Sequence, residues 1–138
     1  MPKPTERRIL VVDDHPVLRD GLRALFGSTN DLVVCGEAEN GAEAMAAVQK
    51  LRPDLAIVDV SLRGGEDGIE LTRRLRKKWP ALPILVFSLH QRQVYRDDAL
   101  AAGASGYCIK GKGSKPLIQA IRKVLRSVAR RPSRSSPQ

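Results

Sequence analysis

The chain has 138 residues, a length typical of one domain with a core large enough to fold unaided. Its 42% hydrophobic and 28% charged residues are ordinary for a soluble globular domain, and no apolar run is long enough to span a membrane. The formal charge of +9 is concentrated at one end, because basic residues from Arg122 onward occur without any acidic residue.

The N-terminal part predicts alternating strands and helices. Residues 1–8 are polar and lead straight into a strand, so we expect no signal peptide. That strand is predicted over the apolar run 9–12. It ends at three polar residues, Asp13, Asp14 and His15. Pro16 suits the first turn of a helix, where its missing N–H is not needed. A weaker strand is predicted over 32–38, and Asn40 is the predicted N-cap of the next helix.

The run from Leu55 to Val60 predicts a strand that is buried on both faces. It contains one carboxylate, Asp59, near its end. A glycine-rich loop over 62–68 follows, and then a helix over 69–79. The outer face of that helix is basic, with Arg73, Arg74, Arg76, Lys77 and Lys78. We interpret this face as solvated rather than as a binding patch.

Two further strands complete the strand pattern. The apolar run 84–87 ends on Ser88, and the run 105–109 ends on Lys110. Between them, an alanine-rich helix over 94–102 has few large apolar residues, so we expect it to be loosely anchored.

The C-terminal segment predicts a clear amphipathic helix that ends near Val128. We expect a domain over 1–128 and a basic tail over 129–138, either disordered or the start of an interdomain linker.

Alternating strands and helices predict a parallel α/β sheet with helices on both faces. In such a sheet the carboxyl ends of all strands lie along one edge, where α/β folds bind their ligands. The polar residues at these ends therefore converge: Asp13, Asp14, Asp59, Ser88 and Lys110.

This combination of side chains predicts a particular chemistry. Clustered carboxylates repel one another unless a cation is present, and oxygen ligands suit Mg²⁺ or Mn²⁺. A carboxylate can also act as a nucleophile and form an aspartyl phosphate. The metal ion and a lysine would then neutralise the transferring phosphoryl group. The chain has no Walker glycine loop, so this is not a P-loop nucleotide site.

Four segments resemble the receiver domain of two-component response regulators over about residues 6–128. They are the runs Val-Val-Asp-Asp-His-Pro at 11–16, Ile-Val-Asp at 57–59, Val-Phe-Ser at 86–88 and Ala-Gly-Ala-Ser-Gly-Tyr-Cys-Ile-Lys at 102–110. The first and last runs are most similar to the NarL/FixJ (LuxR-type) branch. The resemblance implies a flavodoxin-like three-layer sandwich with a five-stranded sheet in the order 2-1-3-4-5.

The resemblance also implies a role for each site residue. Asp59 would accept a phosphoryl group from a sensor histidine kinase or phosphotransfer protein. The metal ligands would be the carboxylates of Asp13, Asp14 and Asp59 and the backbone carbonyl of Ser61. Lys110 would pair with the phosphate, and Ser88 and Tyr107 would act as switch residues. Such a domain is a signalling domain rather than an enzyme, and homodimerisation on phosphorylation is one possible consequence.

The chain departs from the family pattern in several places. The usual Met-Pro after the acceptor is replaced by Leu62 and Arg63, in a loop one residue longer than usual. Leu89 follows the switch hydroxyl where many relatives have a small residue, and we expect His90 to face solvent. After Val128 only ten residues remain, too few for a helix-turn-helix motif. DNA binding would therefore need a domain outside this chain, which is either a stand-alone receiver or a fragment.

Two other classes of function stay open at this point. One is a flavodoxin-like ligand-binding protein that is never phosphorylated. The other is a basic nucleic-acid-binding protein, which the aromatic content of 4% disfavours because it offers few stacking platforms. Cys35 and Cys108 are too few for a disulfide framework and lack metal-site spacing, which fits a reducing, cytoplasmic setting.

Overall fold

Five parallel strands form the central sheet in the order β2-β1-β3-β4-β5 in the computed structural model, which describes residues 6–129. The strands are β1 Arg7–Val12, β2 Leu32–Ala38, β3 Leu55–Val58, β4 Ile84–Ser88 and β5 Gly106–Ile109. The helices are α1 Pro16–Gly27, α2 Gly41–Leu51, α3 Gly68–Lys78, α4 Gln93–Ala101 and α5 Ser114–Ala129. The predicted flavodoxin-like fold and strand order are confirmed.

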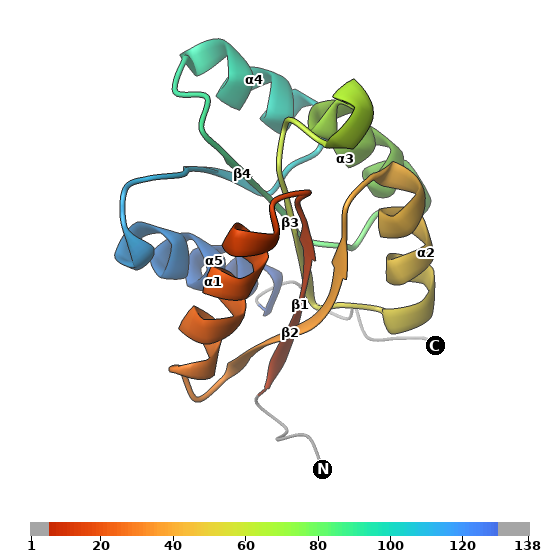
Figure 1. Ribbon diagram of the computed structural model, residues 1–138. Helices are drawn as coiled ribbons and strands as arrows, with labels where there is room; N and C mark the ends of the chain where they lie inside the picture. The colour runs from red at the N-terminus through yellow and green to blue at the C-terminus, as the bar shows by residue number, and fades with distance from the viewer. Residues whose placement is uncertain (1–5, 130–138) are drawn as a thin grey trace.

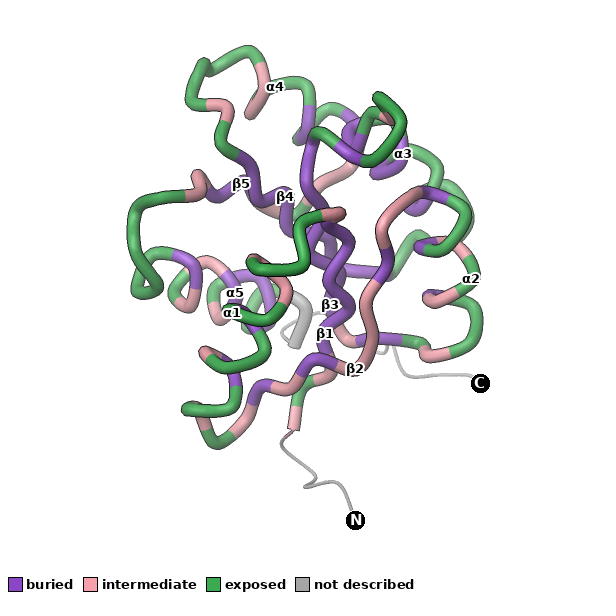
Figure 2. The backbone as a smooth tube through the Cα atoms, in the orientation of Figure 1, coloured by how far each residue is buried: buried purple, intermediate pink, exposed green. Residues whose placement is uncertain are grey.

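Helices cover both faces of the sheet, with α1 and α5 on one side and α2 and α3 on the other (Figure 1). Alternate residues of β1 point to the two sides: Ile9 packs in the core under α1 and α5, and Leu10 packs in the core under α2 and α3. Strands β3 and β4 are buried along their whole length, and β1 is buried from Ile9 to Val12 (Figure 2). Near-continuous apolar strands are therefore required here, as the sequence predicted.

Capping residues set where the helices begin. Pro16 is in the first turn of α1, and the side chain of Asn40 accepts a hydrogen bond from the backbone N–H of Glu43 at the start of α2. Both were predicted. The carboxylate of Asp67 caps α3 in the same way by accepting from Ile69 N. These caps satisfy backbone donors that the first turn of a helix leaves unpaired.

Two details of the loop after β3 differ from the prediction. The strand ends at Val58, so Asp59 lies just past it rather than within it. The glycine-rich loop also contains a short 3₁₀ turn, η1 Arg63–Gly65, in which Gly64 has a φ of 75°. That left-handed backbone suits glycine and explains the local composition.

Helix α4 is loosely anchored, as predicted. Ala99 is its one buried residue among the described parts of the chain, while Val94 is 47% and Leu100 44% exposed. Cys35 on β2 and Cys108 on β5 lie on the two edge strands and are free thiols.

The basic C-terminal segment is only partly described. Arg122 on α5 forms a bidentate pair with Asp31 in the turn between α1 and β2, at 2.5 and 3.0 Å. This residue of the basic segment is thus used to fasten α5 to the domain. Residues 130–138, which make up nearly all of the predicted tail, lie outside the described residues.

Candidate functional site

The predicted strand-end residues meet at the carboxyl edge of the sheet. Backbone hydrogen bonds extend the strand pairing by one residue there: Asp13 N donates to Ala38 O at 2.9 Å, and Asp59 N donates to Val12 O at 3.0 Å. In the same way, Lys110 N donates to Ser88 O at 2.8 Å. The positions of Asp13, Asp59 and Lys110 are therefore set by the sheet itself.

Lys110 joins the carboxylates of two different strands. Its Nζ lies 2.7 Å from Asp13 Oδ2 and 3.1 Å from Asp59 Oδ2. All three side chains are nearly buried, at 10%, 3% and 5% exposed. The low local dielectric makes this charge-assisted arrangement strong, and it makes an uncompensated carboxylate costly.

The electrostatic environment of Asp59 disfavours its ionised form. Burial raises the pKa of Asp59 above its ordinary value, the charge of Lys110 acts to lower that pKa, and the neighbouring Asp13 acts to raise it. The net result is a raised pKa. An additional cation at this edge would stabilise the ionised carboxylate.

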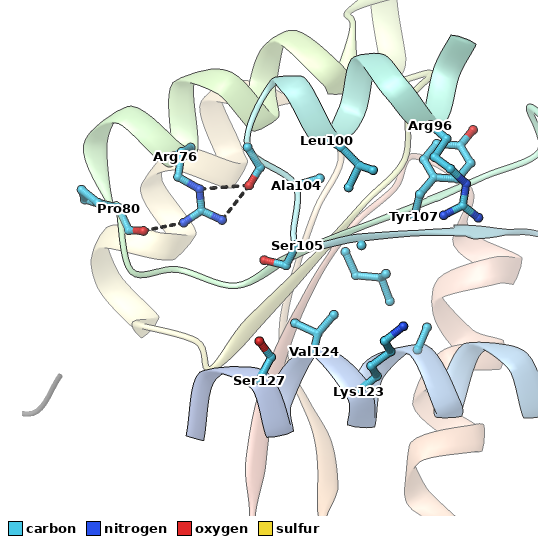
Figure 3. Close-up of a pocket in the computed structure, with 14 residues that line it drawn as sticks. Arg76, Pro80, Arg96, Leu100, Ala104, Ser105, Tyr107, Lys123, Val124 and Ser127 are labelled. Carbon is cyan, nitrogen blue, oxygen red and sulfur yellow. Dashed lines mark hydrogen bonds between the residues drawn. The ribbon is translucent and has the colours of Figure 1, made fainter. Parts of the chain in front are cut away.

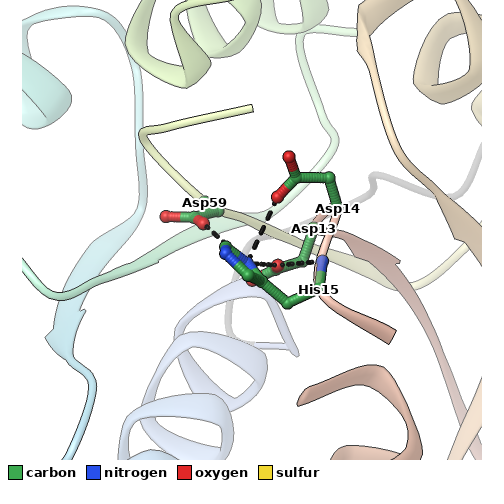
Figure 4. A group of neighbouring side chains, drawn as sticks. All are labelled: Asp13, Asp14, His15 and Asp59. Atoms are coloured by element: carbon green, nitrogen blue, oxygen red, sulfur yellow. Dashed lines mark hydrogen bonds and ion pairs between the residues drawn. The ribbon is translucent and has the colours of Figure 1, made fainter. Parts of the chain in front are cut away.

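His15 lies among the same carboxylates, which the sequence reasoning did not anticipate. Its Nδ1 is 2.6 Å from Asp13 Oδ1, 3.2 Å from Asp14 Oδ1 and 3.9 Å from Asp59 Oδ2 (Figure 4). The sequence feature that could have indicated this is the position of His15 between the two aspartates and Pro16. A proline restricts the backbone of the residue before it to extended conformations.

The carboxylates can hold a divalent cation. One ligand atom from each of Asp13, Asp14, His15 and Asp59 lies within 4.8 Å of the others. Asp14 Oδ1 is buried and makes no hydrogen bond, because its approach to His15 is close enough for an ion pair but lacks hydrogen-bond geometry. A buried oxygen without a hydrogen-bond partner, beside two more carboxylates, fits a hard cation such as Mg²⁺.

The loop after Asp59 folds back tightly over that residue. Gly68 N donates to Val60 O at 2.6 Å, and a Cβ at Gly68 would lie 1.8 Å from the backbone oxygen of Asp59. Ser61 N lies 3.4 Å from Asp59 Oδ1. Gly68 is thus a functional position that the sequence reasoning treated only as the end of a loop.

Ser88 and Tyr107 lie on the side of the site toward α4. Ser88 is fully buried, and its Oγ accepts a hydrogen bond from His90 N at 3.1 Å. The Tyr107 ring is buried, and its hydroxyl donates to His90 O at 2.6 Å. Burial raises the pKa of the Tyr107 hydroxyl. The two predicted switch residues are therefore linked through one backbone segment.

The prediction that His90 faces solvent is wrong. Its ring is half-buried and stacks on Tyr95, with ring centroids 4.1 Å apart and planes inclined by 17°. Its Nε2 also lies 3.4 Å from Ser61 Oγ. Leu89 is instead the outward-facing residue, 69% exposed.

Arg19 supports the acidic site from the neighbouring helix, and the sequence reasoning missed it. Its Nη1 donates to the backbone oxygen of Asp13 at 2.6 Å, while Nε and Nη2 donate to Glu37 and Glu39 at 2.8 and 3.1 Å. Glu39 also binds Arg63 of η1 at 3.0 Å. The Arg19 side chain, only 12% exposed, thereby joins the loop of Asp13 to β2 and to the loop of Glu39, and Glu39 extends the network to η1.

The fold and this edge define a class: a flavodoxin-like α/β domain with an acidic, lysine-bridged site at its strand ends. Residues 9–122 match the response regulator receiver domain. The DNA-binding transcriptional activator DevR/DosR of Mycobacterium tuberculosis is 43% identical over 117 residues, which are 85% of this chain and 54% of that protein. Response regulator GacA of Pseudomonas viridiflava is 35% identical over 117 residues, which are also 85% of this chain and 54% of that protein.

A solved structure agrees with these relatives. The two-component response regulator of the LuxR family from an Aurantimonas species superposes with a TM-score of 0.84 and 38% identity, covering 88% of this chain and 86% of that one. The chain belongs to the response regulator receiver domain family, in its NarL/FixJ (LuxR-type) branch. It spans about half the length of the full-length relatives it matches, at 54%. Within residues 6–129, no helix combines the length and apolar character needed to cross a membrane.

Proposed function

We propose that Asp59 accepts a phosphoryl group from a sensor histidine kinase or phosphotransfer protein, in a reaction that depends on Mg²⁺ or Mn²⁺. The observation that carries this proposal is the bridge from Lys110 Nζ to both Asp13 and Asp59, whose side chains are all nearly buried. A domain that merely bound a ligand would have no need of a nucleophilic carboxylate held beside a lysine and two more acids.

Each residue has a role in the proposed transfer. A carboxylate oxygen of Asp59 bonds to phosphorus while the phosphorus–nitrogen bond of a phosphohistidine donor breaks, and that electron pair stays on the donor nitrogen. The ammonium group of Lys110 pairs with the carboxylate of Asp59 before the transfer and with the phosphoryl oxygens after it. The cation would be held by Asp13, Asp14, Asp59 and the backbone carbonyl of Ser61. When bound there, it supplies positive charge to the transferring phosphoryl group.

The proposed output passes through Ser88 and Tyr107. New charge at Asp59 draws the Ser88 hydroxyl toward it, which breaks the bond from His90 N and frees the segment that Tyr107 holds. The face beyond Tyr107 carries a cleft of about 770 Å³ between α4, β5 and α5, lined by residues such as Arg96, Leu100 and Lys123 (Figure 3). Homodimerisation on phosphorylation is part of this proposal.

The wider biological role follows from the relatives. DevR/DosR is a DNA-binding transcriptional activator, so we infer that this domain controls transcription through a DNA-binding domain outside the present chain. In this scheme residues 1–128 are the receiver and 129–138 begin the linker. The free state of Cys35 and Cys108 supports a cytoplasmic location.

Intact-mass measurement after treatment with acetyl phosphate and Mg²⁺ tests the acceptor. The parent protein should gain one phosphate, and Asp59→Asn should gain none. Asp20→Asn is the matched control, because Asp20 is an exposed carboxylate on α1 and should leave labelling unchanged. Labelling of Asp59→Asn to the level of the parent would refute the assignment.

Amide hydrogen exchange tests the switch. Adding a beryllofluoride phosphate mimic should change exchange most between Ser88 and Tyr107, where α4 is weakly anchored. Unchanged exchange in that segment with the mimic demonstrably bound would contradict the proposed output.

A further inference from the structure

We propose that His15 makes the acidic centre selective among cations: its imidazole becomes a ligand for a first-row transition ion such as Co²⁺ or Zn²⁺, but contributes nothing to Mg²⁺ binding. The inference deepens the proposed function and rests on the cation centre described there. Asp13, Asp14 and Asp59 supply oxygen to either kind of ion. His15 supplies the one nitrogen.

The first argument is geometric. His15 Nδ1 lies 2.6, 3.2 and 3.9 Å from oxygens of three carboxylates, so the ring nitrogen points into the group rather than past it (Figure 4). A small shift of the ring would place Nδ1 and these oxygens around one point. One of the oxygens that would share the ion, Asp14 Oδ1, is buried and has no hydrogen-bond partner.

The second argument is the restraint on His15. Pro16 follows it and disfavours the helical backbone, and His15 has a φ of −101° and a ψ of 106°. Its backbone N–H also donates to Asp13 Oδ1 at 2.9 Å. The ring is therefore held over the carboxylates at little further entropic cost. Its side chain is 61% exposed, which leaves the outer side of the centre open to water ligands.

The third argument is the chemistry of the donor. Ionised carboxylates only accept hydrogen bonds, so Nδ1 carries the hydrogen that it shares with Asp13. Ligation requires the other neutral tautomer, in which the hydrogen is on Nε2 and Nδ1 offers its lone pair. Imidazole is a good ligand for zinc and neighbouring ions, whereas Mg²⁺ prefers oxygen and keeps much of its water. For Mg²⁺ the ring must move aside.

The variant His15→Asn separates the ligand from the hydrogen-bond donor. An asparagine amide can still donate to Asp13, but its nitrogen has no lone pair for a metal ion. We expect the Co²⁺ dissociation constant, measured by calorimetry at one fixed pH, to rise about tenfold or more. The Mg²⁺ dissociation constant should not rise. The visible absorption of bound Co²⁺ should also shift, because the nitrogen ligand is replaced by oxygen from water or from the asparagine amide.

His90→Asn is the matched control. It removes the other histidine of the chain, whose ring stacks on Tyr95, and should leave the ratio of the two dissociation constants unchanged. Equal weakening of Co²⁺ and Mg²⁺ in His15→Asn would overturn the inference and make His15 a positioning residue for the carboxylates. An unchanged Co²⁺ constant and spectrum would overturn it as well. If the parent protein bound neither ion, the cation centre of the proposed function would itself be wrong.

Discussion

Replacing Gly68 by alanine should destabilise the domain and disturb Asp59 together. A Cβ built on Gly68 lies 1.8 Å from the backbone oxygen of Asp59, 2.8 Å from its carbonyl carbon and 3.0 Å from the Cα of Val60. All of these are backbone atoms of the segment that leaves β3, so no side-chain rotation relieves the overlap. The start of α3 or the Asp59 peptide must move by more than an ångström to reach ordinary contact.

The size of the effect follows from this overlap. Forcing one extra methyl group into a well-packed site costs about 1–3 kcal/mol, and here the displaced element also carries the hydrogen bond from Gly68 N to Val60 O at 2.6 Å. We therefore expect the free energy of unfolding of Gly68→Ala to fall by about 2–3 kcal/mol. Because the shift moves the peptide of Asp59, labelling by acetyl phosphate should slow as well.

Gly21→Ala is the matched control. Gly21 lies inside α1 at an exposed position, and a Cβ there meets nothing within 4 Å. The same chemical change should stabilise the domain by about 0.5–1 kcal/mol, because alanine favours the helix. Urea unfolding of the two variants should thus give changes of opposite sign. A Gly68→Ala protein as stable and as rapidly labelled as the parent would refute the close approach of the loop to Asp59.

Three further predictions concern charges. Asp59→Asn should stabilise the metal-free domain at neutral pH. Burial raises the pKa of Asp59 in the folded state, so the ionised carboxylate of the parent opposes folding above that pKa. The stability gained by Asp59→Asn, measured by urea unfolding, should therefore vanish at low pH, where the carboxyl group of the parent is neutral. Arg122→Met should cost about 0.2–1 kcal/mol, since the pair with Asp31 is about one-third exposed. The hydrogen bond from Arg122 lowers the pKa of Asp31, so this loss should be present at neutral pH, disappear as pH falls through the folded pKa and shrink with salt; a pH-independent loss would contradict it. Arg19→Gln should lower the free energy of unfolding by about 1–3 kcal/mol and weaken Mg²⁺ binding measured by calorimetry, because it leaves the Asp13 loop unsupported. Arg23→Gln, which removes only an exposed partner of Glu37, should change neither the free energy of unfolding nor Mg²⁺ binding. Equal effects in the two variants would show that Arg19 does not position the Asp13 loop.

The elements of the fold were predictable because their signals are local. The apolar run 9–12 must be a buried strand whichever partner it finds, and a proline at position 16 can begin a helix without losing a needed hydrogen bond. Parallel pairing then places Asp13, Asp59 and Lys110 at one edge as a matter of topology. This is why the candidate site could be assembled from the sequence before any distance was known.

The contacts that shape the site depend on atoms brought together only by folding. Nothing near Gly68 in the sequence records that its α-carbon meets the oxygen of Asp59. His90 was expected in solvent, but α4 brings Tyr95 onto its ring.

The sequence by itself determined the alternation of elements, the strand-end aspartates and lysine, and through them the family. Only the tertiary structure decided that the ring of His15 enters the acidic centre and that Arg19 joins the loop of Asp13 to Glu37 and Glu39. The physical reason is one of range. Periodicity and capping act between residues that are close in the sequence, so they can be recognised there. Tertiary hydrogen bonds and packing act over a few ångströms between segments that are far apart in the sequence, and that separation does not tell which segments meet.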